Sequence, residues 1–506
     1  MYFLEIILYL LLSCFVISGV YTLIFTVSSV FPIKRQNISF KPKVSVIIPC
    51  RNEEDVIEKT LNSVKNQNYP DFEVIVVDDN SSDKTAKIVE KFIDLNGLNN
   101  FKLLKRKEMN SKKAKAVNDA LKYAEGDVTV FFDADNRPEN NCITNLVKRF
   151  SDDKIAAVQG RIFANITNLI SKIVFMERCG GFNARFIGRE RLGLNCQFGG
   201  TTVAVRTKIL KALGGFNEET LTEDTYLTSN LIRQGYRIVY EPNAVVREEA
   251  PPNISNYITQ RTRWASGHMK CFFEHALPIL KAPISLKDKI DSLIFLAYYF
   301  IPILCGISII IGITSIYFNI RLMGYVSIIG IILSLTPFLE IGIGVLRSKN
   351  KVNIYLLPSM MFFFVLNSII CFNAIFNILK GNNFWVKTER INTSRKIGKD
   401  TQVTMFSSVL VCLLLIGSVG STFLSPLDTY FTQKGNYTAP DIIGVPLNSD
   451  HSVNKSNSTN ISTSKISKQK TYKNQIKTKS VKITSNSSNT KVINSNLNQT
   501  HNMTTT

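Results

Sequence analysis

Residues 128–135 read Val-Thr-Val-Phe-Phe-Asp-Ala-Asp, a mostly apolar run that ends in two carboxylates. An apolar run without alternation predicts a strand that is covered on both faces, as in a parallel sheet. Residues two apart on an extended chain point the same way, so Asp133 and Asp135 can face one ligand. Open α/β sheets bind ligands beyond the carboxyl ends of their strands. The stretch therefore predicts an α/β fold with an acidic ligand site at one edge of its sheet.

Two earlier segments repeat this arrangement. Residues 44–49 (Val-Ser-Val-Ile-Ile-Pro) and 74–77 (Val-Ile-Val-Val) also predict buried strands, and the second ends at Asp78-Asp79. Between them, residues 57–64 carry apolar side chains at helical spacing. Alternating strands and helices indicate one α/β domain, and its carboxylates fall repeatedly at strand ends.

The Asp133-Ala134-Asp135 motif has the chemistry of a metal and diphosphate site. Hard divalent cations prefer carboxylate oxygens, and Mg²⁺ commonly bridges one or two carboxylates to substrate phosphates. Lys113 precedes a helical pattern that leads into the same strand, and its ammonium could hold a phosphate. A solvated acidic turn and a plain surface lysine are the alternative interpretations.

Thr222-Glu223-Asp224 follows Leu213-Gly214-Gly215-Phe216, a turn signal that could deliver a loop to the ligand site. A carboxylate that is separate from the metal pair could deprotonate an acceptor hydroxyl as general base. Alternatively, Thr222 caps the helix that follows; both interpretations can hold at once.

Residues 260–264 read Gln-Arg-Thr-Arg-Trp. On a helix Gln260, Arg263 and Trp264 share one face, which combines an amide, a guanidinium for phosphate and an indole for a sugar ring. The alternative is an interfacial helix on which Trp264 is a membrane anchor.

The net charge of +21 does not indicate a nucleic-acid-binding protein. The tail after residue 425 is rich in Lys and poor in acidic residues, and further basic residues flank the apolar runs, as in residues 347–351, where cations favour the cytoplasmic side of a membrane and anionic lipid heads. The nine cysteines are scattered without paired spacing, so neither a disulfide framework nor a zinc site is expected.

Five apolar runs are each long enough to cross a bilayer: 3–31, 289–318, 323–346, 353–380 and 403–424. The first has no basic segment before it, which favours a retained anchor over a cleaved signal peptide. If 353–380 lies in the membrane interface, the basic segment 381–400 stays in the cytoplasm. That arrangement places the tail outside. The tail contains seven Asn-x-Ser/Thr acceptors: Asn436, Asn454, Asn457, Asn460, Asn486, Asn498 and Asn502.

This ordered set of motifs resembles the processive family 2 glycosyltransferases, namely cellulose synthases, hyaluronan synthases and bacterial poly-N-acetylglucosamine and chitin-oligosaccharide synthases. The matching residues are Ile48-Pro49, Asn52-Glu53-Glu54, Val77-Asp78-Asp79, Lys113, Asp133-Ala134-Asp135, Thr222-Glu223-Asp224 and Gln260-x-x-Arg263-Trp264. One departure is Arg51, where the family commonly has an aromatic residue.

The resemblance implies a cytoplasmic GT-A domain, Rossmann-like and specific for nucleotide-sugars, combined with transmembrane helices in the plasma membrane. The expected parts are an anchor at 1–41, the catalytic domain ending in interfacial helices at 42–285, a channel region at 286–424 with segments 353–380 and 381–400, and a disordered tail at 425–506.

The resemblance also implies roles on the donor side. Glu53 and Asp79 would lie against the nucleoside, and Lys113 near the diphosphate. Asp133 and Asp135 would hold Mg²⁺ or Mn²⁺ together with the diphosphate.

On the acceptor side, Asp224 would act as base in a single inverting displacement. Gln260, Arg263 and Trp264 would bind the diphosphate and the acceptor sugar, with Glu223 beside them. A gating loop over the nucleotide would include Trp385, Thr388 and Arg390.

The expected function is transfer from a UDP-sugar to a growing β-linked polysaccharide and its extrusion, with membrane lipids and, as an open alternative, accessory export proteins as partners. A non-processive enzyme with a lipid acceptor, as in ceramide glucosyltransferases, is the alternative. A transporter or scaffold is disfavoured because the carboxylates lie outside the apolar runs.

Overall fold

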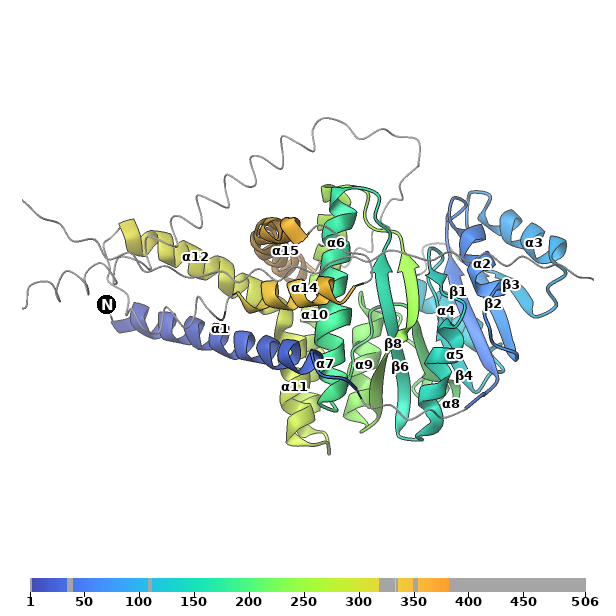
Figure 1. Ribbon diagram of the computed structural model, residues 1–506, viewed down its shortest axis with the longest axis horizontal. Helices are drawn as coiled ribbons and strands as arrows, with labels where there is room; N and C mark the ends of the chain where they lie inside the picture. Colours follow the sequence, from blue (N-terminus) through green and yellow to red (C-terminus); the bar gives the residue numbers. More distant parts are fainter. Residues whose placement is uncertain are drawn as a thin grey trace, which may run out of the picture. The chain divides into compact units, whose positions relative to one another are not determined.

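The computed structural model describes residues 2–33, 40–107, 112–317, 333, 335–348 and 354–381, all within the first of the chain's two units, Met1–Tyr437. An eight-stranded sheet organises this part (Figure 1), in the order β3-β2-β1-β4-β7-β6-β8-β5. The strands are β1 (Val44–Cys50), β2 (Phe72–Asp78), β3 (Phe101–Lys105), β4 (Val128–Phe131), β5 (Arg137–Pro138), β6 (Ile155–Ala164), β7 (Val203–Arg206) and β8 (Arg237–Glu248).

Helices connect these strands and cover both faces of the sheet. They are α2 (Ile57–Lys65), α3 (Thr85–Leu95), α4 (Lys113–Leu121), α5 (Cys142–Val147), α6 (Leu169–Cys179), α7 (Phe186–Arg191), α8 (Thr207–Ala212), α9 (Glu223–Arg233) and α10 (Ile254–Lys281). The strands expected at 44–49, 74–77 and 128–132 and the helix expected at 57–64 are confirmed by β1, β2, β4 and α2.

The strands β3, β2, β1 and β4 are parallel, and their lack of alternation has a direct cause. Val46 and Ile48 of β1 pack in one core cluster with Leu61 of α2. The residue between them, Ile47, packs on the other face with Val117 of α4. Because both faces of the sheet are buried here, apolar side chains follow one another along the strand.

The sheet is mixed, which the apolar runs did not predict. β7 is antiparallel to β4 and to β6, and β5 is antiparallel to β8. Since β7 runs opposite to β4, its first residue Val203 pairs with Phe131, the last residue of β4. The segment that precedes β7 therefore lies beside the carboxyl end of β4, where Asp133 follows.

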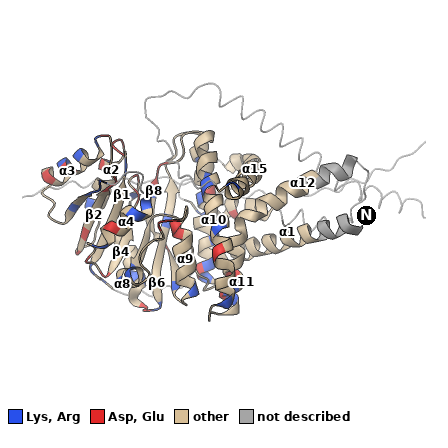
Figure 2. Cartoon of the chain, turned by 180° about the vertical axis from the view of Figure 1, so that it is seen from behind, with Lys and Arg blue, Asp and Glu red and all other residues tan. Residues whose placement is uncertain are grey.

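Further helices extend beyond the sheet: α1 (Tyr2–Ser29), α11 (Leu286–Leu296), α12 (Ile301–Tyr317), α14 (Thr336–Leu346) and α15 (Met360–Leu379). Leu286–Ser308 and Ile354–Leu379 are long and apolar enough to cross a membrane, whereas Ser13–Ser29 and Thr336–Leu346 are shorter. Figure 2 shows no charged residue along the coloured parts of α1 and α12, while α10 and α11 carry charges of both signs. The run at 403–424 lies outside the described residues.

Candidate active site

A pocket that is partly open to solvent lies at the carboxyl end of β4. Apolar side chains of β4, α4 and the 198–203 segment form much of its wall. Its charged lining residues are Lys113, Asp133, Glu223 and Asp224. The structure thus brings together four residues that the sequence marked in three separate segments.

The turn that carries Asp133 is fixed by two polar side chains. The backbone N–H of Asp133 lies 3.1 Å from both Asn136 Oδ1 and Thr201 Oγ1. The Thr201 hydroxyl in turn donates to Asn136 Oδ1. Asn136 and Thr201 are fully or almost fully buried, so the β7 side of the sheet holds the turn in place.

Asp135 is buried and lies apart from the pocket wall. Its Oδ2 accepts a hydrogen bond from the Glu249 N–H at 3.3 Å, after the end of β8. Among the described residues no group of three or more His, Cys, Asp or Glu could hold a metal ion. Of the two aspartates Asp133 lines the pocket, where a cation would take its remaining ligands from substrate phosphates and water.

Lys113 is the first residue of α4, and its ammonium reaches across the pocket. It forms an ion pair with Asp133 and donates to the Gly200 carbonyl at 3.0 Å. Burial opposes its charge, but the carboxylates of Asp133, Glu223 and Asp224 raise the pKa of Lys113. The side chain therefore stays a cation, as a phosphate-binding residue must.

Glu223 and Asp224 form the first turn of α9. Burial raises the pKa of both carboxyls, and the Lys113 and Arg263 charges oppose this shift. Asp224 Oδ1 accepts the Thr225 N–H at 2.8 Å. A carboxylate with a raised pKa in a pocket is suited to accept a proton near neutral pH.

The helix-capping interpretation of Thr222 is confirmed only in part. Thr222 occupies the N-cap position of α9, but its side chain makes no capping hydrogen bond. Its hydroxyl lies 3.7 Å from Cys271 Sγ instead. Helix α10 crosses at this point, where a Cβ on Gly267 would lie 2.4 Å from the Thr222 Cγ2. Thr222 is thus a packing residue between α9 and α10.

Helix α10 carries Gln260, Arg263 and Trp264, and none of the three lines the pocket. Arg263 contacts the backbone just before α9, since its Nη1 donates to the Leu221 carbonyl at 3.2 Å. The Trp264 ring lies 4.3 Å from the Arg261 guanidinium, which also pairs with Glu177.

Two loops at the ends of β1 and β2 are joined by hydrogen bonds, as in the Asn52 N–H to Ser81 Oγ contact at 2.9 Å. Glu53 and Asp79 are both buried there. Asp79 forms an ion pair with Arg106, a buried residue that the sequence did not mark. Among the described residues, Asp78 Oδ1 is buried without a hydrogen-bond partner.

Residues 45–212 match the family model described as glycosyl transferase family 2. Over 402 residues the chain is 31% identical to "Probable glycosyltransferase YdaM" of Bacillus subtilis, covering 76% of this chain and 95% of the relative. The chain belongs to glycosyl transferase family 2. It is therefore an enzyme that transfers glycosyl groups, and the mixed sheet is the GT-A-like form of the Rossmann-type fold.

Two further relatives of this family 2 glycosyltransferase have more specific names. "Beta-monoglucosyldiacylglycerol synthase" of Trichormus variabilis is 32% identical over 269 residues, which are 52% of this chain and 56% of the relative. "Poly-beta-1,6-N-acetyl-D-glucosamine synthase" of Staphylococcus epidermidis is 28% identical over 240 residues, 47% of this chain and 57% of the relative. The chain spans little more than half the length of these two relatives.

Some of the residues that form the site of this glycosyltransferase were not identified from its sequence. Asn136 follows the Asp-Ala-Asp motif directly and Thr201 follows Gly199-Gly200, but neither residue belongs to a motif that was identified in the sequence. Gly200 has φ +83°, and a Cβ there would lie 3.4 Å from Asp224 Oδ2. The expected gating-loop residues Trp385, Thr388 and Arg390 lie outside the described residues.

Proposed function

We propose that this glycosyltransferase is membrane-embedded and inverting, and that it transfers a sugar from a UDP-sugar to a growing β-linked polysaccharide. The observation that carries the proposal is the pocket in which Lys113, Asp133 and Asp224 meet. It offers a cation for a diphosphate and a carboxylate for an acceptor hydroxyl within one pocket.

The transfer is a single displacement at the anomeric carbon. The acceptor oxygen forms a bond to that carbon while its proton passes to Asp224. The bond from the carbon to the diphosphate oxygen breaks, and its electron pair leaves with the nucleoside diphosphate. Lys113 stabilises this developing negative charge as a point cation. The raised pKa of Asp224 matches the role of a base near neutral pH.

In this proposal Asp133 and Asp135 would hold Mg²⁺ or Mn²⁺, which would neutralise the diphosphate when bound. Within the chain itself, Asn136 and Thr201 keep the Asp133 turn fixed, and Lys113 balances its charge. The nucleoside would lie over the Glu53 and Asp79 loops.

Helix α10 supplies the acceptor side in this proposal. Arg263 and Gln260 would face the diphosphate and the acceptor, with Glu223 beside the reacting hydroxyl. Trp264 would offer its indole to the acceptor sugar, while Arg261 and Arg178 at 4.3 and 5.6 Å from its ring keep its orientation.

The apolar helices support a multi-pass enzyme in the plasma membrane with its catalytic domain in the cytoplasm. Leu286–Ser308 and Ile354–Leu379 are of spanning length. Basic residues at 347–351 favour the cytoplasmic side. The relative named poly-β-1,6-N-acetyl-D-glucosamine synthase supports a polysaccharide product.

A lipid acceptor is the second candidate. It is favoured by the relative named beta-monoglucosyldiacylglycerol synthase, with 32% identity. In that case one sugar would be transferred to a membrane lipid without extrusion of a polymer.

One experiment separates the two candidates. Membranes that contain the enzyme are incubated with a panel of radiolabelled nucleotide-sugars and Mg²⁺ or Mn²⁺, and the product is extracted with organic solvent and sized. A water-soluble polymer supports the polysaccharide product, whereas label confined to a glycolipid supports the lipid acceptor. No incorporation from any donor with either metal would contradict both.

A further inference from the structure

His268 contacts the residue next to the proposed base and does not line the pocket. Its Nε2 is 3.0 Å from Thr225 Oγ1, and that hydroxyl is 3.4 Å from Asp224 Oδ1. His268 belongs to α10, four residues after Trp264, whereas Asp224 and Thr225 belong to α9. A short polar chain thus connects the acceptor-side helix to the carboxylate.

The donor and the acceptor in each of these two hydrogen bonds follow from the protons that each group carries. An ionised Asp224 only accepts hydrogen bonds, so the single Thr225 hydroxyl proton points to Asp224. The imidazole must then donate from Nε2 to the Thr225 oxygen, which leaves Nδ1 without a proton. In the described part of the chain Nδ1 is buried and has no partner, as suits a bare lone pair.

The surroundings of the imidazole are apolar. Its ring lies 5.5 Å from Phe295 and 4.7 Å from Tyr299. Burial lowers the pKa of His268 to about 4, so the ring is neutral at pH 7. A neutral ring in one tautomer is a fixed donor and not a titrating charge.

The two oxygens of Asp224 are consequently not equivalent. Oδ1 receives the Thr225 N–H at 2.8 Å and the Thr225 hydroxyl at 3.4 Å. Oδ2 faces Gly200, where an added Cβ would lie 3.4 Å away. With Oδ1 held by these hydrogen bonds, Oδ2 is the oxygen that remains for the acceptor hydroxyl.

We propose that His268 is a positioning residue which, through the Thr225 hydroxyl, holds Asp224 Oδ1 and aims Oδ2 at the acceptor. The inference rests on the proposed role of Asp224 as base. It gives α10 a second function besides carrying Arg263 and Trp264, because a shift of this helix would also misalign the base.

Paired substitutions test the proposal. Thr225→Val removes the hydroxyl at nearly constant volume, and Thr225→Ser retains it. His268→Leu removes the donor, and His268→Gln retains an N–H near the Nε2 position. A lost hydrogen bond to a charged group corresponds to roughly 10–100-fold in kcat. We expect that loss for Thr225→Val and His268→Leu, an unchanged KM for the UDP-sugar, and kcat within about 3-fold of wild type for Thr225→Ser and His268→Gln.

Two further readouts distinguish positioning from packing. The double variant Thr225→Val/His268→Leu should be no slower than Thr225→Val alone, since each substitution interrupts the same series of hydrogen bonds from His268 to Asp224. The acid limb of kcat/KM should move to higher pH in Thr225→Val, because Asp224 loses a donor while Glu223, Lys113 and Arg263 still face it. A wild-type kcat in Thr225→Val, or losses that multiply in the double variant, would overturn the proposal. If His268→Leu does not fold, kcat and the pH profile of the two Thr225 variants decide between these outcomes.

Asp224→Asn is assayed in parallel to separate the role of the base from that of His268. An active Asp224→Asn enzyme contradicts the base assignment itself. An inactive Asp224→Asn enzyme beside a fully active Thr225→Val enzyme contradicts only the role of His268.

Discussion

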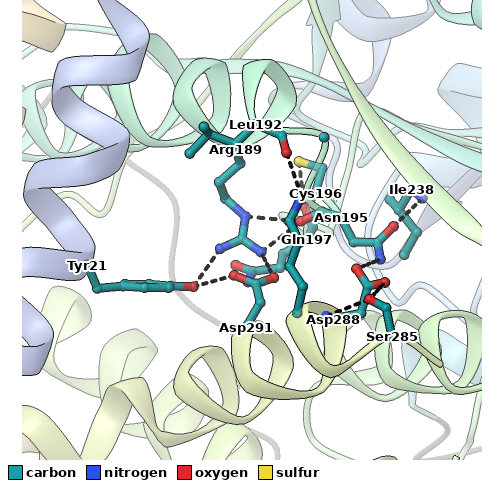
Figure 3. A network of polar contacts seen from close by, with 12 residues as sticks. Tyr21, Arg189, Leu192, Asn195, Cys196, Gln197, Ile238, Ser285, Asp288 and Asp291 are labelled. Atoms are coloured by element: carbon teal, nitrogen blue, oxygen red, sulfur yellow. Dashed lines mark hydrogen bonds and ion pairs between the residues drawn. The ribbon is translucent and has the colours of Figure 1, made fainter.

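Arg189 of α7 and Asp291 of α11 form an almost fully buried ion pair that joins the catalytic domain to the apolar helices. Figure 3 shows the Tyr21 hydroxyl of α1 between the two charges, at 2.7 Å from each. Arg189 also donates to the Asn195 carbonyl at 3.0 and 2.8 Å. The segment after Asn195 leads to Gly200 and Thr201, so this cluster connects the apolar helices to the pocket wall.

Asp291→Asn should destabilise the protein by about 3–5 kcal/mol, because it leaves the buried Arg189 cation without a countercharge. Tyr21→Phe removes a hydrogen bond at the same cluster and should cost only about 1 kcal/mol. Thermal unfolding of the purified protein measures both. Equal small shifts would mean that solvent reaches Arg189 and that the pair is not buried.

Asp224→Asn should lower kcat by about 10²–10⁴-fold while the affinity for the nucleotide-sugar stays unchanged, because only the general base is lost. Glu223→Gln is the matched control, as it changes a neighbouring carboxylate of the same pocket. We expect it to raise the KM for the acceptor with a smaller effect on kcat. The opposite pattern would transfer the base role to Glu223.

The sequence predicted the features that depend on local pattern. Apolar runs located β1, β2 and β4, and the position of Lys113 ahead of a helix that leads into β4 predicted a phosphate-binding cation near the Asp-Ala-Asp motif, where Lys113 pairs with Asp133. These predictions succeed because each uses the spacing of neighbouring residues and one general topological rule.

The features that the sequence missed depend on contacts between distant segments. Antiparallel β7 brings Thr201 to the Asp133 turn, and Arg106 reaches Asp79 from beyond β3. Neither contact leaves a periodic signal, because it arises from strand direction and side-chain packing. Thr222 illustrates the converse, since its local sequence predicted a cap while the approach of α10 gave it a packing role.

Gly267→Ala should lower kcat by as much as about 10²-fold, since α10 would have to move away from Thr222 and carry Arg263 with it. The added Cβ would lie 2.4 Å from Thr222 Cγ2 and 2.6 Å from its Oγ1. Gly181→Ala is the control, because a Cβ there meets nothing within 4 Å. Kinetics of the two purified variants check this, and wild-type kcat in Gly267→Ala would show that the contact adjusts without cost.

Acid should destabilise the fold through His275, which is 3% exposed and packs edge-on against Tyr226 at 4.5 Å. Burial, helped by the Arg233 charge, lowers the pKa of His275 to about 4. The unfolded histidine has a pKa of about 6.5, so between about pH 6.5 and 4 the unfolded chain binds the extra proton. Stability is therefore complete above about pH 6.5 and is lost as the pH falls, by about 2 kcal/mol at pH 5.

His275→Phe keeps an aromatic ring against Tyr226 but cannot bind a proton, so it should reduce the fall in unfolding temperature between pH 7 and pH 5. His268 titrates in the same window and accounts for part of the remaining fall. Unfolding curves at both pH values compare the variant with the wild type. An identical fall in the two proteins would mean that His275 is already solvated, because only a buried neutral ring opposes protonation in the folded state.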